Sequence, residues 1–259
     1  MSIIWNPWHG CHKKSEGCAN CYMFFFDSQR GQESSRVYRV KNSFDLPVRK
    51  DKNGRWKVPS GELVYTCMTS DFFIKEADEW RGDVWKMIEQ RQDILFHIFT
   101  KRPERIKECL PENWGDGWNN VWLSVSTENQ KRADERIPIL KGIPLKYRGI
   151  IAAPLLEGID IEKYLQDDLI SIVSAGGENY DGARPCDYQW VKNLYDQCVR
   201  ADINFEFHQT GANFIKNGKR YYIPKKKQRE QAVKSGLRHK GREIKVNLKE
   251  VSEQKKLFD

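Results

Sequence analysis

Three cysteines near the N-terminus have the residue type and the spacing of a metal centre. They are Cys11, Cys18 and Cys21, in the pattern C-x6-C-x2-C. Gly10 and Gly17 each precede a cysteine, so the backbone can fold tightly around a small object. Three thiolates in one loop repel one another unless a cation or a cluster neutralises them. We therefore expect these three cysteines to be metal ligands.

Two kinds of metal centre fit this pattern. Iron–sulfur clusters are held by cysteine thiolates, and a loop with three cysteines leaves one iron of a four-iron cluster open. Zinc is the alternative, with His12 or a fourth cysteine completing a tetrahedron. No second C-x2-C pair exists to complete a four-cysteine zinc site. The sequence favours a cluster, and zinc or three unligated thiols remain the alternatives.

The elements that must position these cysteines alternate between short apolar segments and amphipathic ones. The apolar segments have the length and the β-branched or aromatic content of buried parallel strands. The segments between them have helical spacing of apolar residues. We expect strands at residues 62–68, 94–99, 121–125, 149–153, 169–173 and 203–208, with a further candidate near 3–5, and helices at 80–91, 103–110, 130–141 and 188–201.

This alternation predicts an α/β fold around a parallel sheet. Six or seven strands fit a single (β/α) barrel, incomplete, with the cysteine loop near the N-terminus; a doubly wound open sheet is the alternative. In either fold, functional groups gather at the carboxyl ends of the strands, where most of the predicted strands are followed by polar residues. We expect residues 1–215 to form the barrel. Residues 216–259 would be a basic extension packed on it or extending from it.

The basic character of the chain lies in its C-terminal region. The formal net charge is +8, whereas residues 216–259 hold 15 Lys and Arg and 5 Asp and Glu, a net of +10, which leaves −2 for the rest. Such a region can attract a polyanion, or it can simply be a solvated surface. No apolar run is long enough for a membrane helix and no signal pattern begins the chain, so we expect a soluble cytoplasmic protein with no membrane contact.

Several phrases of the chain resemble a known superfamily. They are WNPWHGC and GCANCY around the cysteines, and then MTSDFF, FTKRPERI, NVWLSVSTENQ, APLLEG, AGGENYDGARP and HQTG, within residues 3–215. The chain resembles the radical S-adenosylmethionine superfamily, and more closely an uncharacterised phage and prophage branch of it with three cysteines. Most of the superfamily has three residues between the first two cysteines, where this chain has six.

The resemblance implies a cofactor and a set of binding residues. The cofactors would be a [4Fe-4S] cluster and S-adenosylmethionine, whose amino and carboxylate groups chelate the open iron. Each candidate side chain also has a structural interpretation, as a helix cap, a surface charge or a hydrogen-bonded core group. The candidates for cofactor binding are Thr69, Ser70, Asp71, Thr100, Lys101, Arg102, Ser124, Ser126, Glu128 and Asn129, and those for substrate binding are Gly176, Gly177, Glu178, Arg184, His208 and Gln209.

The resemblance also implies a function. We expect a radical enzyme that modifies or repairs a nucleic acid or a nucleotide, with DNA or RNA bound through the basic C-terminal region and an external electron donor as a partner. A radical enzyme acting on a peptide or a small metabolite is one alternative. A non-catalytic iron–sulfur protein that binds nucleic acid or a partner enzyme is the other.

Overall fold

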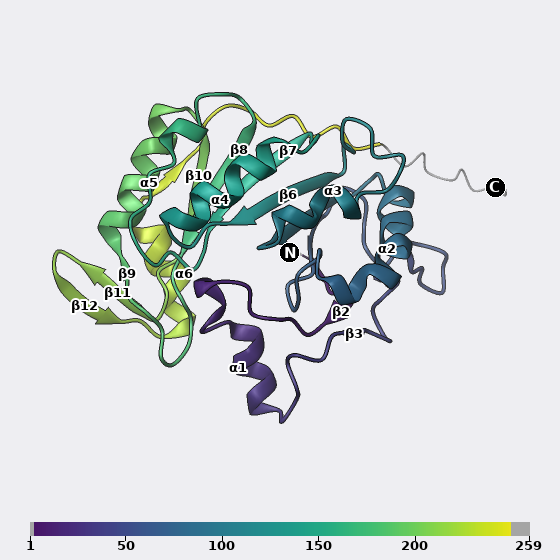
Figure 1. The fold of residues 1–259 in the computed structure, drawn as a ribbon, viewed down its shortest axis with the longest axis horizontal. Helices are drawn as coiled ribbons and strands as arrows, with labels where there is room; N and C mark the ends of the chain where they lie inside the picture. The colour runs from purple at the N-terminus through teal and green to yellow at the C-terminus, as the bar shows by residue number, and fades with distance from the viewer. Residues whose placement is uncertain (1–2, 250–259) are drawn as a thin grey trace.

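The computed structural model describes residues 3–249, and within them the chain is built on an eight-stranded sheet (Figure 1). The strand order is β1-β4-β5-β6-β7-β8-β10-β13, and all neighbours are parallel except β13, which runs antiparallel to β10. The strands are β1 (Ile3–Trp5), β4 (Leu63–Thr66), β5 (Leu95–Thr100), β6 (Val121–Ser126), β7 (Tyr147–Ala152), β8 (Ile170–Gly176), β10 (Asn204–Gln209) and β13 (Arg238–His239).

Smaller elements surround this sheet. Three short strands form a second sheet in the order β12-β11-β9, and β2 pairs with β3. They are β2 (Trp8–His9), β3 (Tyr38–Arg39), β9 (Cys186–Asp187), β11 (Asn213–Lys216) and β12 (Lys219–Tyr222). The helices are α1 (Tyr22–Gln29), α2 (Asp78–Gln90), α3 (Ile106–Cys109), α4 (Gln130–Lys141), α5 (Tyr188–Arg200) and α6 (Lys225–Lys234).

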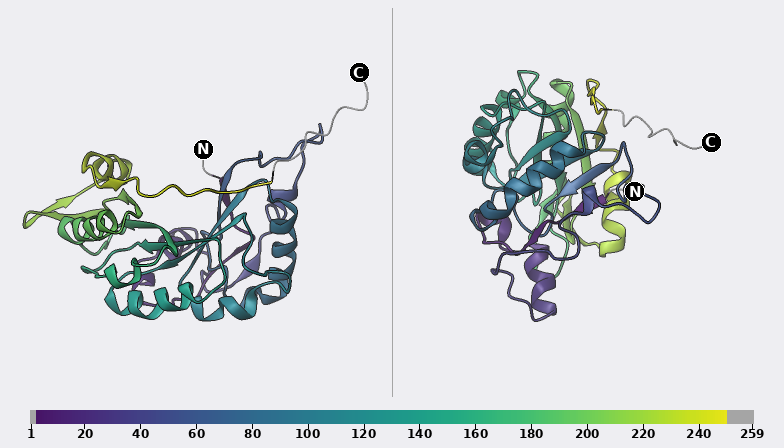
Figure 2. Two further views of the ribbon diagram at one scale, coloured as in Figure 1. Left: turned by 90° about the horizontal axis from the view of Figure 1, so that it is seen from above. Right: turned by 90° about the vertical axis from the view of Figure 1, so that its right-hand side faces the viewer.

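One face of the large sheet is covered by helices, as Figure 2 shows. Helix α4 packs against β6 and β7, and α5 against β8 and β10. Alternate strand residues such as Ile98 and Leu123, which are register partners, are fully buried on this side. The matching stripe of α5 consists of Val191, Leu194 and Cys198, also fully buried. Burial of this apolar face stabilises the fold.

The opposite face carries a row of aromatic side chains that crosses four strands. The ring centroids of Tyr65 and His97 are 5.8 Å apart, those of His97 and Trp122 are 5.4 Å apart, and those of Trp122 and Tyr147 are 5.7 Å apart. His97 also forms a 2.7 Å hydrogen bond to the Ser124 hydroxyl. Burial lowers the pKa of His97 to about 3, so the ring is neutral at pH 7 and serves as a core group of this face.

The chain after β13 runs back across this aromatic face (Figure 2). The Tyr147 hydroxyl donates to the Lys245 carbonyl at 3.1 Å and accepts from the Asn247 amide at 3.3 Å. Apolar residues at alternate positions of this segment pack beside Leu95, Trp122 and Tyr147; they are Ile244, Val246 and Leu248.

The α/β fold and its parallel sheet are as predicted from the sequence, and each predicted strand and helix corresponds to an element within a few residues. Within residues 3–249 the sheet does not close into a barrel: its edges are β1 and β13. The chain turns back after β10 through α6 and adds β13 antiparallel, which ends the run of parallel βα units. The expected domain boundary at residue 215 falls inside β11. Among the described helices, none combines the length and the apolar character needed to cross a bilayer.

Gly149 tests the close contact between β6 and β7. A Cβ at this position would lie 2.3 Å from Ser124 Oγ and 3.1 Å from Trp122 Nε1. We expect Gly149→Ala to lower the free energy of unfolding by about 1–3 kcal/mol, because the added methyl overpacks the site. The double variant with Ser124→Ala should lose less than the sum of the two single variants, with a coupling of about 0.5 kcal/mol or more in urea denaturation.

The matched control is Gly82→Ala in α2, where an added Cβ would meet nothing within 4 Å. This change should raise stability slightly, since alanine favours the helix over glycine. Strict additivity of the Gly149 and Ser124 changes would contradict the proposed contact.

Candidate metal and cofactor site

The three N-terminal cysteines lie on one loop between β2 and α1. Cys11 follows β2, Cys18 ends a short 3-10 turn, and Cys21 is the residue before the first turn of α1. All three side chains are half-buried. Gly10 has a φ of +90°, and a Cβ there would lie 2.1 Å from the Arg36 carbonyl oxygen, so the loop needs glycine at this position.

This loop rests on the carboxyl ends of the parallel strands. One polar side chain from the end of each of four strands, β4, β5, β6 and β8, bonds to it. The contacts are Ser70 Oγ to the Gly10 carbonyl, Arg102 Nη2 to the His12 carbonyl at 2.7 Å, the Gly17 amide to Glu128 Oε1 at 3.2 Å, and Asn20 Nδ2 to Glu178 Oε2 at 2.9 Å. The structure therefore brings polar groups predicted from four separate segments to one loop.

Asp71 organises the anchor after β5. Its carboxylate accepts from Thr100 Oγ1 at 2.8 Å and from the Lys101 amide at 2.9 Å, and lies 3.1 Å from the Arg102 guanidinium. The same guanidinium nitrogen, Nη1, is 3.8 Å from Cys11 Sγ. Asp71 and Thr100 thus hold Arg102 against the first cysteine, and their polar atoms are engaged by the protein itself.

Glu128 forms the anchor after β6 and is fully buried. Besides Gly17, it accepts a hydrogen bond from the Ser15 hydroxyl and pairs with Arg136 at 2.9 Å. Burial raises the pKa of Glu128, but the charges of Lys101 and Arg136 outweigh burial, and the pKa lies below its usual 4.5. Glu128 is therefore an ionised loop anchor.

The anchor after β8 combines Glu178 with Arg184. The Glu178 carboxylate accepts from the Arg184 amide at 2.8 Å and from its Nε at 3.1 Å. Arg184 then donates from Nη2 to the Glu16 carbonyl of the cysteine loop at 2.9 Å. Glu178 and Arg184, which were predicted from the sequence to bind substrate, are thus both bonded to the cysteine loop.

Gly176 and Gly177 create space at the end of β8. A Cβ on Gly176 would lie 2.5 Å from His208 Nε2, and one on Gly177 would lie 2.4 Å from the Thr210 carbonyl. Gln209 donates to the Gly177 carbonyl at 2.9 Å, which ties the ends of β8 and β10 together. Burial, with the neighbouring cations Lys225 and Arg229, lowers the pKa of His208 to about 4.

Two of the residues predicted to bind the cofactor already have hydrogen-bond partners within the protein. Ser124 is bonded to His97 in the sheet interior, and Asn129 caps α4 by accepting from the Arg132 amide at 2.9 Å. Three others lie near the loop with spare capacity. Lys101 Nζ has Ser126 Oγ as a neighbour at 3.2 Å, and the shielded Thr69 hydroxyl has no hydrogen-bond partner within residues 3–249. A shielded polar atom of this kind is ready to accept a ligand.

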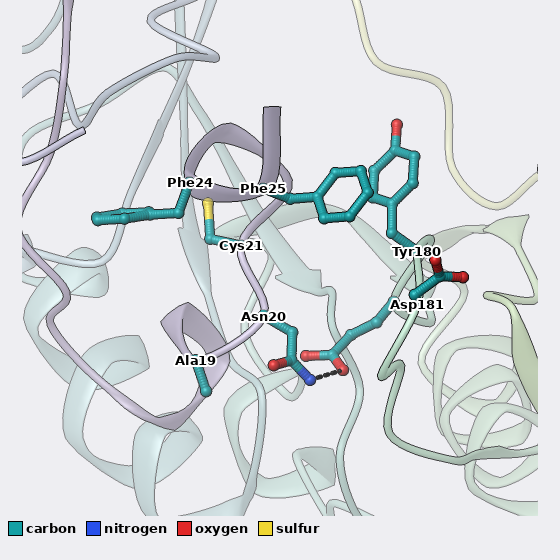
Figure 3. Close-up of a pocket in the computed structure, with 8 residues that line it drawn as sticks. Ala19, Asn20, Cys21, Phe24, Phe25, Tyr180 and Asp181 are labelled. Atoms are coloured by element: carbon teal, nitrogen blue, oxygen red, sulfur yellow. Dashed lines mark hydrogen bonds between the residues drawn. The ribbon is translucent and has the colours of Figure 1, made fainter. Parts of the chain in front are cut away.

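A cavity opens beside Cys21, between the start of α1 and the loop after β8 (Figure 3). The ring of Phe25 stacks on that of Tyr180, with centroids 4.7 Å apart and an interplanar angle of 10°. Its lining combines aromatic rings with the Glu178–Asn20 pair and one thiol. The lining residues are Ala19, Asn20, Cys21, Phe24, Phe25, Glu178, Tyr180 and Asp181.

Burial and neighbouring charges set the protonation of the first cysteine. Burial raises the pKa of the Cys11 thiol to about 12; Asp71, Cys18 and Cys21 add to this shift and Arg102 opposes it. Charge on Cys18 or Cys21 therefore disfavours the thiolate of Cys11. A bound cation would remove the mutual repulsion and favour the thiolates. Within residues 3–249, no three His, Cys, Asp or Glu side chains are gathered closely enough to hold a single ion.

A family model described as "Protein of unknown function (DUF5131)" matches residues 1–250. The chain belongs to this family. The match spans the cysteine loop, the large sheet and the basic region, so these parts of the DUF5131 chain form one family unit. No curated protein and no solved structure matches the chain.

Several residues around the cysteine loop and its cavity were not predicted from the sequence. Ser15 and Glu16 anchor the loop, and Phe25 and Tyr180 line the cavity. The available signal was their position, since Ser15 and Glu16 lie between two cysteines and Phe25 follows Cys21 by one helical turn.

The buried Glu128–Arg136 pair should make stability depend on pH. Because the folded pKa of Glu128 is below 4.5, its contribution is complete above that pH and is lost as the pH falls through the folded value. We expect Glu128→Gln to lower the free energy of unfolding at pH 7 by about 3 kcal/mol or more, since Arg136 is left buried without a counter-charge. The variant should also show a smaller rise in stability between pH 3 and about pH 5 in urea denaturation.

The control is Glu112→Gln, an exposed residue of the connection before β6. It should leave both the stability and its pH dependence unchanged. Equal pH profiles for wild type and Glu128→Gln would contradict the role given to Glu128.

Proposed function

We propose that this chain is a radical S-adenosylmethionine enzyme whose [4Fe-4S] cluster is held by Cys11, Cys18 and Cys21. The observation that carries the proposal is the position of these half-buried thiols, on one loop anchored across the carboxyl ends of four parallel strands. This is where α/β folds place functional groups. The sequence resemblance to the superfamily points to the same chemistry.

The cysteine pattern supports a cluster over a single zinc ion. A structural zinc site takes four protein ligands, and no second C-x2-C pair is present in the chain to complete a four-cysteine site. Three cysteines on one loop would leave one iron of a four-iron cluster open to a cofactor.

The donor set fits such a cluster and a cofactor on its open iron. Cys11, Cys18 and Cys21 would hold the cluster, which when bound and reduced by an external donor would supply one electron for reductive cleavage of the cofactor's sulfonium, with methionine as the other product. Arg102, held by Asp71, is placed to favour the thiolate of Cys11. The Lys101 ammonium is suited to a carboxylate, and Ser126 and the Thr69 hydroxyl are suited to polar groups of the cofactor.

The remaining predicted site residues act through the loop in this proposal. Asp71, Glu128, Glu178 and Arg184 are positioning residues, because their polar atoms bond to loop atoms or to other anchors. The open parallel sheet serves as an incomplete (β/α) barrel with the loop across its top. An external electron donor would reduce the cluster. We place the enzyme in the cytoplasm, where thiols stay reduced.

The first test is the metal content of anaerobically purified protein. We expect about four irons and four sulfides per chain and a paramagnetic signal after reduction. Replacement of Cys11, Cys18 and Cys21 by serine should abolish the cluster. Cys109→Ser is the matched control, since this half-buried thiol lies beside Arg81 and Arg105, away from the loop, and the variant should keep the cluster.

The second test is cofactor cleavage. The reconstituted, reduced protein should form 5′-deoxyadenosine from S-adenosylmethionine, and the three serine variants should not. Lys101→Ala should weaken cofactor binding by on the order of tenfold while iron content stays at the wild-type level. Zinc alone in the purified protein would overturn the cluster. A full cluster without cofactor binding or cleavage would leave a non-catalytic iron–sulfur protein.

A further inference from the structure

Residues 213–240, here called the basic lobe, concentrate positive charge on one part of the structure. They hold ten Lys and Arg and one Glu, a net of 10 − 1 = +9. The lobe comprises strands β11 and β12, helix α6 and strand β13, at the β10 edge of the large sheet (Figure 1). Cations gathered so closely repel one another, and this repulsion destabilises the lobe unless solvent or an anionic partner offsets it.

Most of these cations have no carboxylate beside them. The structure gives ion pairs within 4.0 Å for two of the ten, Lys227 and Lys234, and both pair with Glu230. The remaining eight, within the described residues, are available to an external anion. They are Lys216, Lys219, Arg220, Lys225, Lys226, Arg229, Arg238 and Lys240.

The β11–β12 hairpin also exposes aromatic rings among these cations. All four residues of β12 are exposed, and Tyr222 has 76% of its surface in solvent and Tyr221 has 41%. The hairpin pairs Asn213 with Tyr222. A tyrosine in water gains nothing from packing, whereas an aromatic ring next to cations is suited to stacking on a nucleobase.

A chain of contacts joins the hairpin to the cavity beside Cys21. Asn213 Nδ2 donates to the Ala183 carbonyl at 3.0 Å, in the loop after β8 that also contains Tyr180. Lys225 Nζ, at the start of α6, lies 5.8 Å from the centre of the Tyr180 ring, which lines the cavity. Lys225 therefore lies beside a ring that lines the aromatic cavity, and the hairpin is bonded through Asn213 to the loop that carries this ring.

We propose that the basic lobe binds a single-stranded segment of nucleic acid and presents one of its bases to the aromatic cavity beside Cys21. Cations of the hairpin and α6 contact the phosphates, Tyr222 stacks on one base, and the Phe25–Tyr180 pair receives another. A duplex fits less well, because its bases are stacked and cannot enter a cavity unless they are flipped out. The proposal names the substrate class of the enzyme proposed above. The binding of nucleic acid does not depend on that function, whereas the use of the bound base as a substrate rests on it.

Binding is tested by fluorescence anisotropy with labelled single-stranded DNA and RNA of twelve nucleotides and a duplex of the same length. We expect either single strand to bind more tightly than the duplex. The triple variant Lys219→Ala, Arg220→Ala and Lys226→Ala should weaken binding on the order of tenfold or more near 0.1 M salt. Its salt dependence should fall by about two in log–log slope, since each phosphate contact contributes about 0.7 for single strands.

A matched triple control removes three exposed lysines from other elements, Lys86→Ala, Lys107→Ala and Lys131→Ala. It changes the net charge equally and should keep most of the affinity and the wild-type slope. Tyr222→Ala should weaken single-strand binding about fivefold or more, and Tyr222→Phe should restore it, because stacking needs the ring and not the hydroxyl. Tyr222 is exposed, so neither change should affect folding.

Equal losses in both triple variants, tighter binding of the duplex, or preference for anionic vesicles over oligonucleotides would each overturn the proposal. The measurement is made on cluster-loaded protein and on the variant with all three loop cysteines replaced by serine. Single-strand binding that persists without the cluster supports the nucleic-acid role of the basic lobe, whether or not the protein proves to be a radical enzyme. A loaded, cofactor-cleaving protein that does not bind single strands refutes the lobe and leaves the proposed function intact.

Discussion

The contact on which the site depends is the docking of a short N-terminal loop onto the ends of parallel strands. The loop has little regular structure of its own, so its shape is imposed by Ser70, Arg102, Glu128 and Glu178. Two of these anchors are buried carboxylates compensated by arginines, which makes them costly to leave unpaired. The sheet thus acts as a template that fixes the spacing of the three thiols.

Much of this architecture is predictable from local sequence. Strands such as Leu95–Thr100 and Val121–Ser126 are short apolar runs between clear helical segments, and Gln130–Lys141 begins after a capping asparagine. The cysteine spacing and the polar residues at strand ends are equally visible in one sequence. The position of a strand end therefore predicts which side chains gather at the site.

The role of each gathered side chain is harder to predict, because it depends on partners distant in the sequence. Glu178 follows a paired glycine and looks like a ligand group, but it bonds to Asn20 and Arg184. Asp71 is likewise engaged by Thr100. The local sequence also could not predict that the sheet stays open. The strand that ends it, β13, has only two residues and pairs antiparallel with β10, so no apolar run in the sequence marks it.

The span of these anchors has a consequence for biosynthesis. The bond between Arg184 and the Glu16 carbonyl joins residues 168 positions apart, and that between Glu178 and Asn20 joins residues 158 apart. On a growing chain the cysteines emerge early, yet their last supports are synthesised only after most of the protein has left the ribosome. Until then the thiols are exposed on an unanchored segment. The cysteine loop therefore reaches its anchored shape only when the sheet is complete, late in the maturation of this protein.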